Sequence, residues 1–75
     1  MAKVILQSLS LAIEKNALIK LQVNFLEMPL KEAKKNVDFL LVKRKVILKI
    51  DDDDLAETFF KEAEKIGVNC ELILS

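Results

Sequence analysis

The chain has 75 residues, which is enough for one domain near the lower size limit at which a hydrophobic core folds without metal or disulfide support. It is 52% hydrophobic, and its one cysteine and lack of histidine exclude an internal disulfide and the usual zinc ligand sets. We therefore expect one domain over residues 1–75, without a cofactor, in a reducing, cytoplasmic setting. No apolar run exceeds four residues, so neither a membrane-spanning segment nor a membrane partner is expected.

Charge is divided unevenly along the chain. The formal net charge is zero, but residues 15–49 carry nine Lys or Arg and three acidic residues, whereas residues 51–75 carry two and eight. Such a division indicates a basic surface that meets an acidic partner. The alternative is two solvated surfaces that only keep the domain in solution.

The amino-terminal part begins with a predicted strand over residues 3–8, in which Val4 and Leu6 face the same way. Apolar and polar residues then alternate over residues 8–13 and again over 19–25, which by itself indicates a β-hairpin.

A helix over residues 15–26 competes with that hairpin. It would turn Leu18, Leu21 and Phe25 inward, and leucine suits a helix. The local period favours the hairpin, so both interpretations stay open at this point.

The middle of the chain predicts a helix over residues 29–38. Pro29 suits the first helical position, and apolar residues follow at helical spacing. A strand is predicted over residues 45–50. Residues 39–42 either complete the helix or pair with that strand as a hairpin.

The carboxyl-terminal part predicts a helix over residues 54–66 followed by a strand over 69–74. Asp54 and Glu57 have the spacing of a capping box, and Gly67 stands where a left-handed residue ends a helix. The surplus aspartates favour the positive end of that helix. The expected buried stripe consists of Leu55, Phe59, Ala63 and Ile66.

Several segments together resemble the C-terminal domain of the bacterial ribosomal stalk protein of the large subunit. Residues 30–34 read LKEAK and are followed by Val37 and Asp38, as in that domain's signature. Residues 54–72 are similar to its closing stretch, and residues 4–6 resemble its first strand. The order and spacing of these matches carry the resemblance, which covers nearly the whole chain.

The resemblance implies an α+β fold of order β-α-α-β-α-β, a small antiparallel three-stranded sheet with helices on one face. A helix at residues 15–26 follows from it. The local pattern leaves a β-β-α-β-α-β sandwich with an N-terminal hairpin as the alternative. The family's arginine near the end of the first helix is replaced by Val23, and its N-terminal dimerisation segment has no counterpart here.

The resemblance also implies a function. In the family, lysines and aliphatic residues of the first two helices contact translation factors, so we expect a non-enzymatic protein-binding domain, with a translation GTPase or another acidic protein as partner. Cations would steer an acidic partner and apolar neighbours would supply buried contact area. The residues carried over are Lys15, Ile19, Lys20, Lys31 and Lys34.

Nucleic-acid binding through Lys43, Arg44 and Lys45 is the alternative function. Binders of single strands add stacking aromatic residues, and the four phenylalanines stand mostly at core-like positions. An enzyme has less support, because the sequence lacks histidine and any phosphate-binding glycine loop. The aspartate run lacks the spacing of a calcium loop, and Cys70 is expected to be a buried structural thiol.

Self-association is expected from residues 39–42 and 46–50. A strand such as Val46-Ile47-Leu48 cannot turn every side chain into a core that covers one face. Either the chain covers the remainder itself, or a second copy does so in a homodimer.

Overall fold

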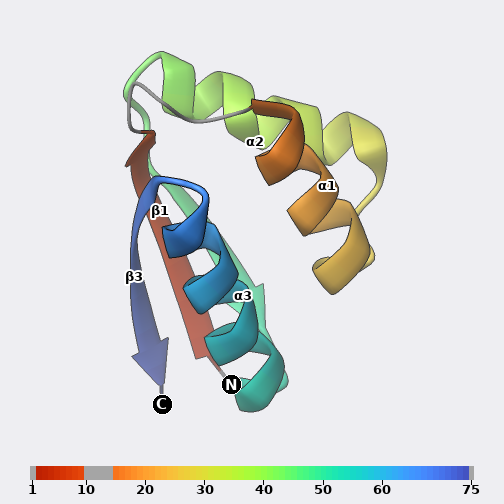
Figure 1. Ribbon diagram of the computed structural model, residues 1–75, viewed down its shortest axis with the longest axis vertical. Coiled ribbons are helices and arrows are strands. Elements are labelled where there is room, and N and C mark those ends of the chain that lie inside the picture. Colours follow the sequence, from red (N-terminus) through yellow and green to blue (C-terminus); the bar gives the residue numbers. More distant parts are fainter. Residues whose placement is uncertain (1, 10–14, 75) are drawn as a thin grey trace.

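The fold has the predicted order β-α-α-β-α-β (Figure 1). The computed structural model describes residues 2–9 and 15–74. Its elements are β1 (Ala2–Leu9), α1 (Lys15–Leu26), α2 (Leu30–Leu41), β2 (Val46–Ile50), α3 (Asp53–Lys65) and β3 (Val68–Leu74). The α+β fold class is therefore confirmed.

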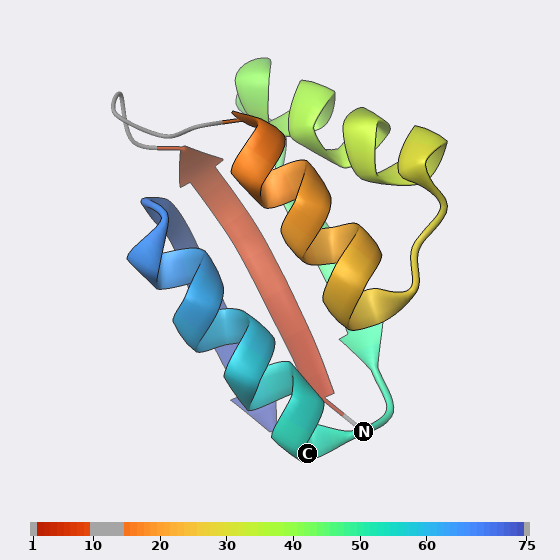
Figure 2. The same cartoon turned by 45° about the vertical axis from the view of Figure 1, so that its right-hand side comes forward.

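The sheet has β1 at its centre, in the order β2-β1-β3, and both pairings are antiparallel. Ile5 of β1 lies opposite Ile47 of β2 and Glu71 of β3. All three helices lie on one face of this sheet (Figure 2). Side chains of alternate strand residues therefore point either into the core or away from the helices.

The core lies between the helices and the sheet. Phe59 of α3 is its largest fully buried residue, and its ring meets that of Phe25 of α1 edge-on, with centroids 6.5 Å apart. The inward strand positions are filled as the alternation predicts: Val4, Leu6, Val46, Leu48 and Ile50 are all buried.

Residues 15–26 form helix α1, so the hairpin predicted from the local period is wrong where the structure describes it. Leu18 and Gln22, four residues apart, are completely buried, and Phe25 packs on α3. Contacts with two neighbouring helices therefore outweigh the strand-like alternation. The remainder of the predicted hairpin, residues 10–14, lies outside the described residues. Residues 39–41 complete α2 instead of pairing with β2.

The amino ends of α2 and α3 differ slightly from the prediction. Pro29 precedes α2 as its N-cap, with an extended ψ of 140°, and Leu30 is the first helical residue. Asp52, rather than Asp54, caps α3: its Oδ1 accepts hydrogen bonds from the backbone N–H groups of Asp54 at 2.9 Å and Leu55 at 3.2 Å. Because the carboxylate of Asp52 already accepts from these backbone donors, the capping box predicted for Asp54 and Glu57 does not form.

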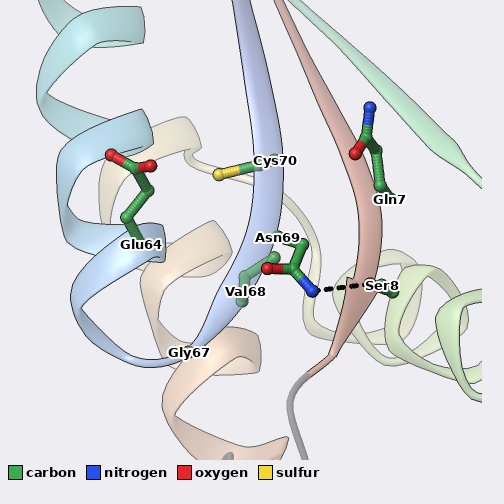
Figure 3. A pocket seen from close by; sticks show the side chains of 7 residues that line it. All are labelled: Gln7, Ser8, Glu64, Gly67, Val68, Asn69 and Cys70. Atoms are coloured by element: carbon green, nitrogen blue, oxygen red, sulfur yellow. Dashed lines mark hydrogen bonds between the residues drawn. The ribbon is translucent and has the colours of Figure 1, made fainter.

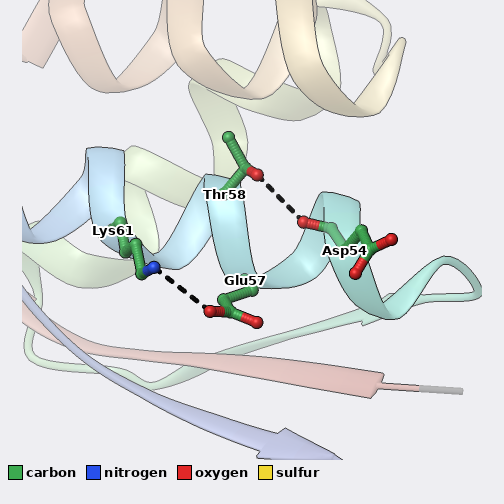
Figure 4. Close-up of polar contacts among 4 residues, drawn as sticks. All are labelled: Asp54, Glu57, Thr58 and Lys61. Carbon is green, nitrogen blue, oxygen red and sulfur yellow. Dashed lines mark hydrogen bonds and ion pairs between the residues drawn. The ribbon is translucent and has the colours of Figure 1, made fainter.

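Asp54 instead lies in the first turn of α3, where its backbone oxygen accepts a hydrogen bond from Thr58 Oγ1 at 2.9 Å (Figure 4). Glu57 and Lys61, four residues apart on α3, form an ion pair with 3.1 Å between Oε1 and Nζ. Both side chains are exposed, so this pair contributes little to stability.

A residue with positive φ follows each helix: Glu27 (51°), Lys43 (63°) and Gly67 (96°). Only the last is glycine, as predicted. At the end of α2, Lys43 N–H donates to Leu40 O at 3.1 Å and Arg44 N–H donates to Phe39 O at 2.8 Å. These two bonds form a Schellman motif with lysine in the position that glycine usually occupies.

No helix in the described part of the chain is long and apolar enough to span a bilayer.

Candidate functional site

The five residues carried over from the stalk-protein family lie on α1 and α2, two helices that pack on each other. Lys15 and Lys20 are exposed on α1, and Lys31 and Lys34 are exposed on α2, on either side of the buried Ala33. Ile19 is half-buried and packs against the core, so only part of its side chain is open to a partner. We call these five residues the α1–α2 basic surface.

Two buried amides fix α1 against α2 beneath this surface. Asn36 Nδ2 donates to Gln22 Oε1 at 2.9 Å, and Gln22 Nε2 lies 3.3 Å from the backbone oxygens of Leu18 and Ala33. No buried side-chain nitrogen or oxygen in the described residues is left without a partner. The relative position of the two helices is therefore determined by polar as well as apolar contacts.

The ion pairs found among residues 2–9 and 15–74 both lie within α3, where Glu57 meets Lys61 and Glu62 meets Lys65. The cations of the α1–α2 basic surface have no such partner in the described chain. No ion pair therefore neutralises these lysines directly, although Glu32 and Asp38 are also exposed on α2; α3 carries the larger number of acidic residues.

The alternative site, Lys43, Arg44 and Lys45, occupies the turn between α2 and β2. All three residues are exposed. The turn lies at one end of the long axis of the molecule, opposite both chain ends (Figure 1). Phe39, whose backbone oxygen bonds Arg44 N–H, is also exposed, to 40%. The last turn of α2 therefore carries an exposed aromatic residue close in the chain to the three cations, which the sequence pattern alone did not indicate.

An open pocket of about 440 Å³ lies where β1 and β3 meet the end of α3 (Figure 3). Leu6 pairs with Cys70 and Ser8 with Asn69, so Gln7 is the extra residue of a β-bulge. Asn69 Nδ2 closes this end of the sheet with a hydrogen bond of 2.8 Å to Ser8 Oγ.

Cys70, which lines this pocket, is half-buried and its sulfur points toward α3 (Figure 3). The thiol lies 3.9 Å from Phe60 O, to which it donates. Burial and, to a smaller extent, the charge of Glu64 raise the pKa of this thiol from 9.0 to about 11. It is therefore protonated at neutral pH, which makes it a poor nucleophile and agrees with the predicted structural role.

The aspartates before α3 act on the helix itself. Asp52 caps it, and Asp53 and Asp54 lie in its first turn, where negative charge is favourable. Within the described residues, no group of three or more acidic or cysteine side chains is arranged to hold a metal ion.

Sequence reasoning missed a groove of about 460 Å³ beside β2, which Met28, Glu32 and Lys49 help to line. These residues are far apart in sequence, so no local pattern unites them. The one indication of the groove in the sequence was Ile47, an exposed apolar residue on a strand whose alternate residues are buried.

No family model, curated protein or solved structure matches this chain.

Proposed function

We propose that the chain is a non-enzymatic, cytoplasmic protein-binding domain that contacts an acidic partner through the α1–α2 basic surface. The observation that carries the proposal is the group of exposed lysines on two adjacent helices, none of them paired with a carboxylate in the described chain. Because the chain resembles the stalk-protein domain in sequence, a translation GTPase is the first partner to test.

The charge distribution supports recognition in one orientation. Lys20 and Lys34 attract a negatively charged surface, whereas the acidic residues of α3 repel it. The exposed part of Ile19 adds apolar contact area between the cations. Association should therefore be fast and sensitive to salt.

The test is titration of the isotope-labelled domain with a purified bacterial translation GTPase, followed by backbone resonances. Shifts should concentrate on α1 and α2. Lys20→Glu and Lys34→Glu should each weaken binding about tenfold at low salt. Lys65→Glu is the matched control: it changes the net charge equally but lies on the acidic α3, and should alter affinity little. Absence of binding, or equal loss with the control, would contradict the proposal.

Binding of single-stranded nucleic acid at the α2–β2 turn is the second candidate function. The exposed Phe39 in the last turn of α2 favours it, since such binders combine cations with a stacking aromatic residue. Fluorescence anisotropy with single-stranded RNA would then show binding that is lost in the Arg44→Glu and Phe39→Ala variants. Binding that depends instead on Lys20 and Lys34 would assign the activity to the α1–α2 basic surface.

A further inference from the structure

The outer edge of β2 has no strand beside it. Among the residues that the structure describes, β1 is the one neighbour of β2 in the sheet. Alternate residues of β2 therefore direct backbone N–H and C=O groups away from the sheet. The strand reads VILKI, pairs with β1 without a bulge, and contains no proline. An extended segment of another protein can therefore add to this edge through main-chain hydrogen bonds.

The two faces of this edge differ in what they offer. Val46, Leu48 and Ile50 are buried beneath the helices. Ile47 and Lys49 alternate with them and are exposed, so they lie on the face of the sheet that the helices leave open (Figure 2).

The side chains of an added strand would alternate between the same two faces. Every second side chain would lie on the open face, beside Ile47 or a lysine. The others would point to the helical side, where Leu26 and Met28 line the groove beside β2. The helical side therefore favours apolar residues, and the open face selects by charge.

On the open face, the charge along this edge is positive. Lys49 lies directly opposite Lys3 of β1, and neither forms an ion pair in the described part of the chain. Like charges in this position destabilise a sheet, and a carboxylate beside Lys49 would relieve the repulsion. A further exposed lysine, Lys45, directly precedes the strand. Glu32 also lines the groove, but it stands on α2, on the helical side.

We propose that β2 binds an extended acidic segment of a partner protein, which adds to the sheet as a fourth strand. Its register places one carboxylate beside Lys45, an apolar residue beside Ile47 and a second carboxylate beside Lys49. The two residues between these positions face the helical side and are apolar. The segment therefore has the pattern acidic, apolar, apolar, apolar, acidic. This site shares no residue with the α1–α2 basic surface.

The surroundings of the edge limit where such a segment fits. Asp51 and Asp52 are exposed directly after β2, so they repel carboxylates beyond Ile50. On the other edge strand, β3, the central residue is the exposed Glu71, which would repel a carboxylate beside it. The acidic segment is therefore directed to β2.

Titration of the isotope-labelled chain with two synthetic peptides tests the proposal. The first peptide contains the sequence Glu-Val-Ile-Val-Glu, and the second has lysine in place of both glutamates. Only the first should bind, with shifts of backbone resonances concentrated on β2 and β1. N-methylation of one set of alternate peptide residues should abolish binding, whereas methylation of the other set should preserve it, because only one set of N–H groups faces β2. This result would distinguish strand addition from charge attraction alone.

Charge variants of the chain test the register. Lys49→Glu should weaken binding of the acidic peptide about tenfold and allow the lysine peptide to bind. Lys45→Glu, outside the strand, should act in the same direction. Lys20→Glu is the matched control, because it changes the net charge equally but lies on α1, and should leave the affinity for the acidic peptide nearly unchanged. Circular dichroism must show that all three variants are folded.

Several outcomes would overturn the proposal. They are absence of binding at millimolar peptide, equal binding of the two peptides, and tolerance of N-methylation at both sets of positions. A greater loss with Lys20→Glu than with Lys49→Glu would assign the peptide to the α1–α2 basic surface instead. Self-association in sedimentation velocity that Ile47→Lys abolishes would assign the edge to a second copy of the chain.

Discussion

Asn36 Nδ2 donates a hydrogen bond of 2.9 Å to Gln22 Oε1 inside the contact between α1 and α2. Both side chains are buried, and Gln22 has no exposed surface. Asn36 Nδ2 also lies 3.4 Å from Met28 Sδ, in the loop that joins the two helices. A buried polar pair of this kind constrains one helix relative to another, because a shift would leave an amide without a partner.

Removing either amide should therefore cost stability. Gln22→Ala and Asn36→Ala should each lower the free energy of unfolding by about 1–3 kcal/mol, since each leaves a buried partner unsatisfied. Urea denaturation of the single and double variants gives the coupling energy. Asn24→Ala, at an exposed position of α1, is the control. Additive losses in the double variant would show that the two amides act independently.

Phe59 should be the most sensitive single apolar position. It is fully buried and contacts the ring of Phe25. Phe59→Ala should cost about 3–5 kcal/mol, a large part of the stability of so small a domain. Phe60→Ala, at the half-buried neighbouring position, should cost clearly less. A melting temperature for Phe59→Ala close to that of the unmodified chain would contradict the packing described for α3.

The sequence predicts α3 well because α3 buries a single stripe. Phe59 and Ala63 are fully buried, Leu55 and Ile66 are half-buried, and the exposed side carries charge. Local hydrophobic periodicity therefore corresponds to the environment of each residue. The strands were predicted for the same reason, since helices cover one face of the sheet only.

The sequence does not identify α1 by its period because α1 packs between α2 and α3. Half-buried residues occur at every second position from Ala17 to Phe25, which produces a strand-like alternation. The central buried position holds Gln22, so the apolar signal four residues after Leu18 is missing. The residues left the helix open as an alternative, and only the family resemblance favoured it over the hairpin.

The candidate sites also contain features that the sequence predicts and features that depend on long-range packing. Exposure of Lys15, Lys20, Lys31 and Lys34 follows from their charge, because lysine is almost never fully buried without a partner, so the sequence alone predicts it. Ile19 is half-buried because α1 has two neighbours. The groove beside β2 unites residues from α1, α2 and β2, and no local pattern contains such a long-range arrangement.

Asp52→Ala should destabilise the domain more than Asp54→Ala. Asp52 accepts two backbone hydrogen bonds at the start of α3, whereas no such cap bond is made by the Asp54 side chain. Loss of an N-cap typically costs about 1 kcal/mol. Chemical denaturation of both variants at neutral pH measures the difference. Equal losses would indicate that the aspartates stabilise α3 only through their charge.

Replacing Lys43 by glycine should stabilise the domain. Lys43 adopts a φ of 63° in the Schellman motif at the end of α2, a conformation that is unfavourable for a residue with a Cβ atom. We expect a gain of about 0.5–1 kcal/mol, because the greater freedom of glycine in the unfolded chain offsets part of the relief. Glu27→Gly should act in the same direction after α1. Lys45→Gly, just before β2, is the control and should not stabilise.

Cys70 should make stability depend on pH in the alkaline range. Its pKa is raised from 9.0 to about 11, so between these values the folded state retains a proton that the unfolded state releases. Stability from this thiol is therefore fully present below pH 9 and decreases as the pH rises toward 11. The measurement is the difference in stability between the unmodified chain and Cys70→Ala, obtained by urea denaturation at several pH values. The loss of folding stability on raising the pH should be smaller in the variant.

Iodoacetamide should modify Cys70 in the folded chain at pH 8 more slowly than in the urea-unfolded chain. Equal rates would show that the thiol is not shielded and that its pKa is not raised.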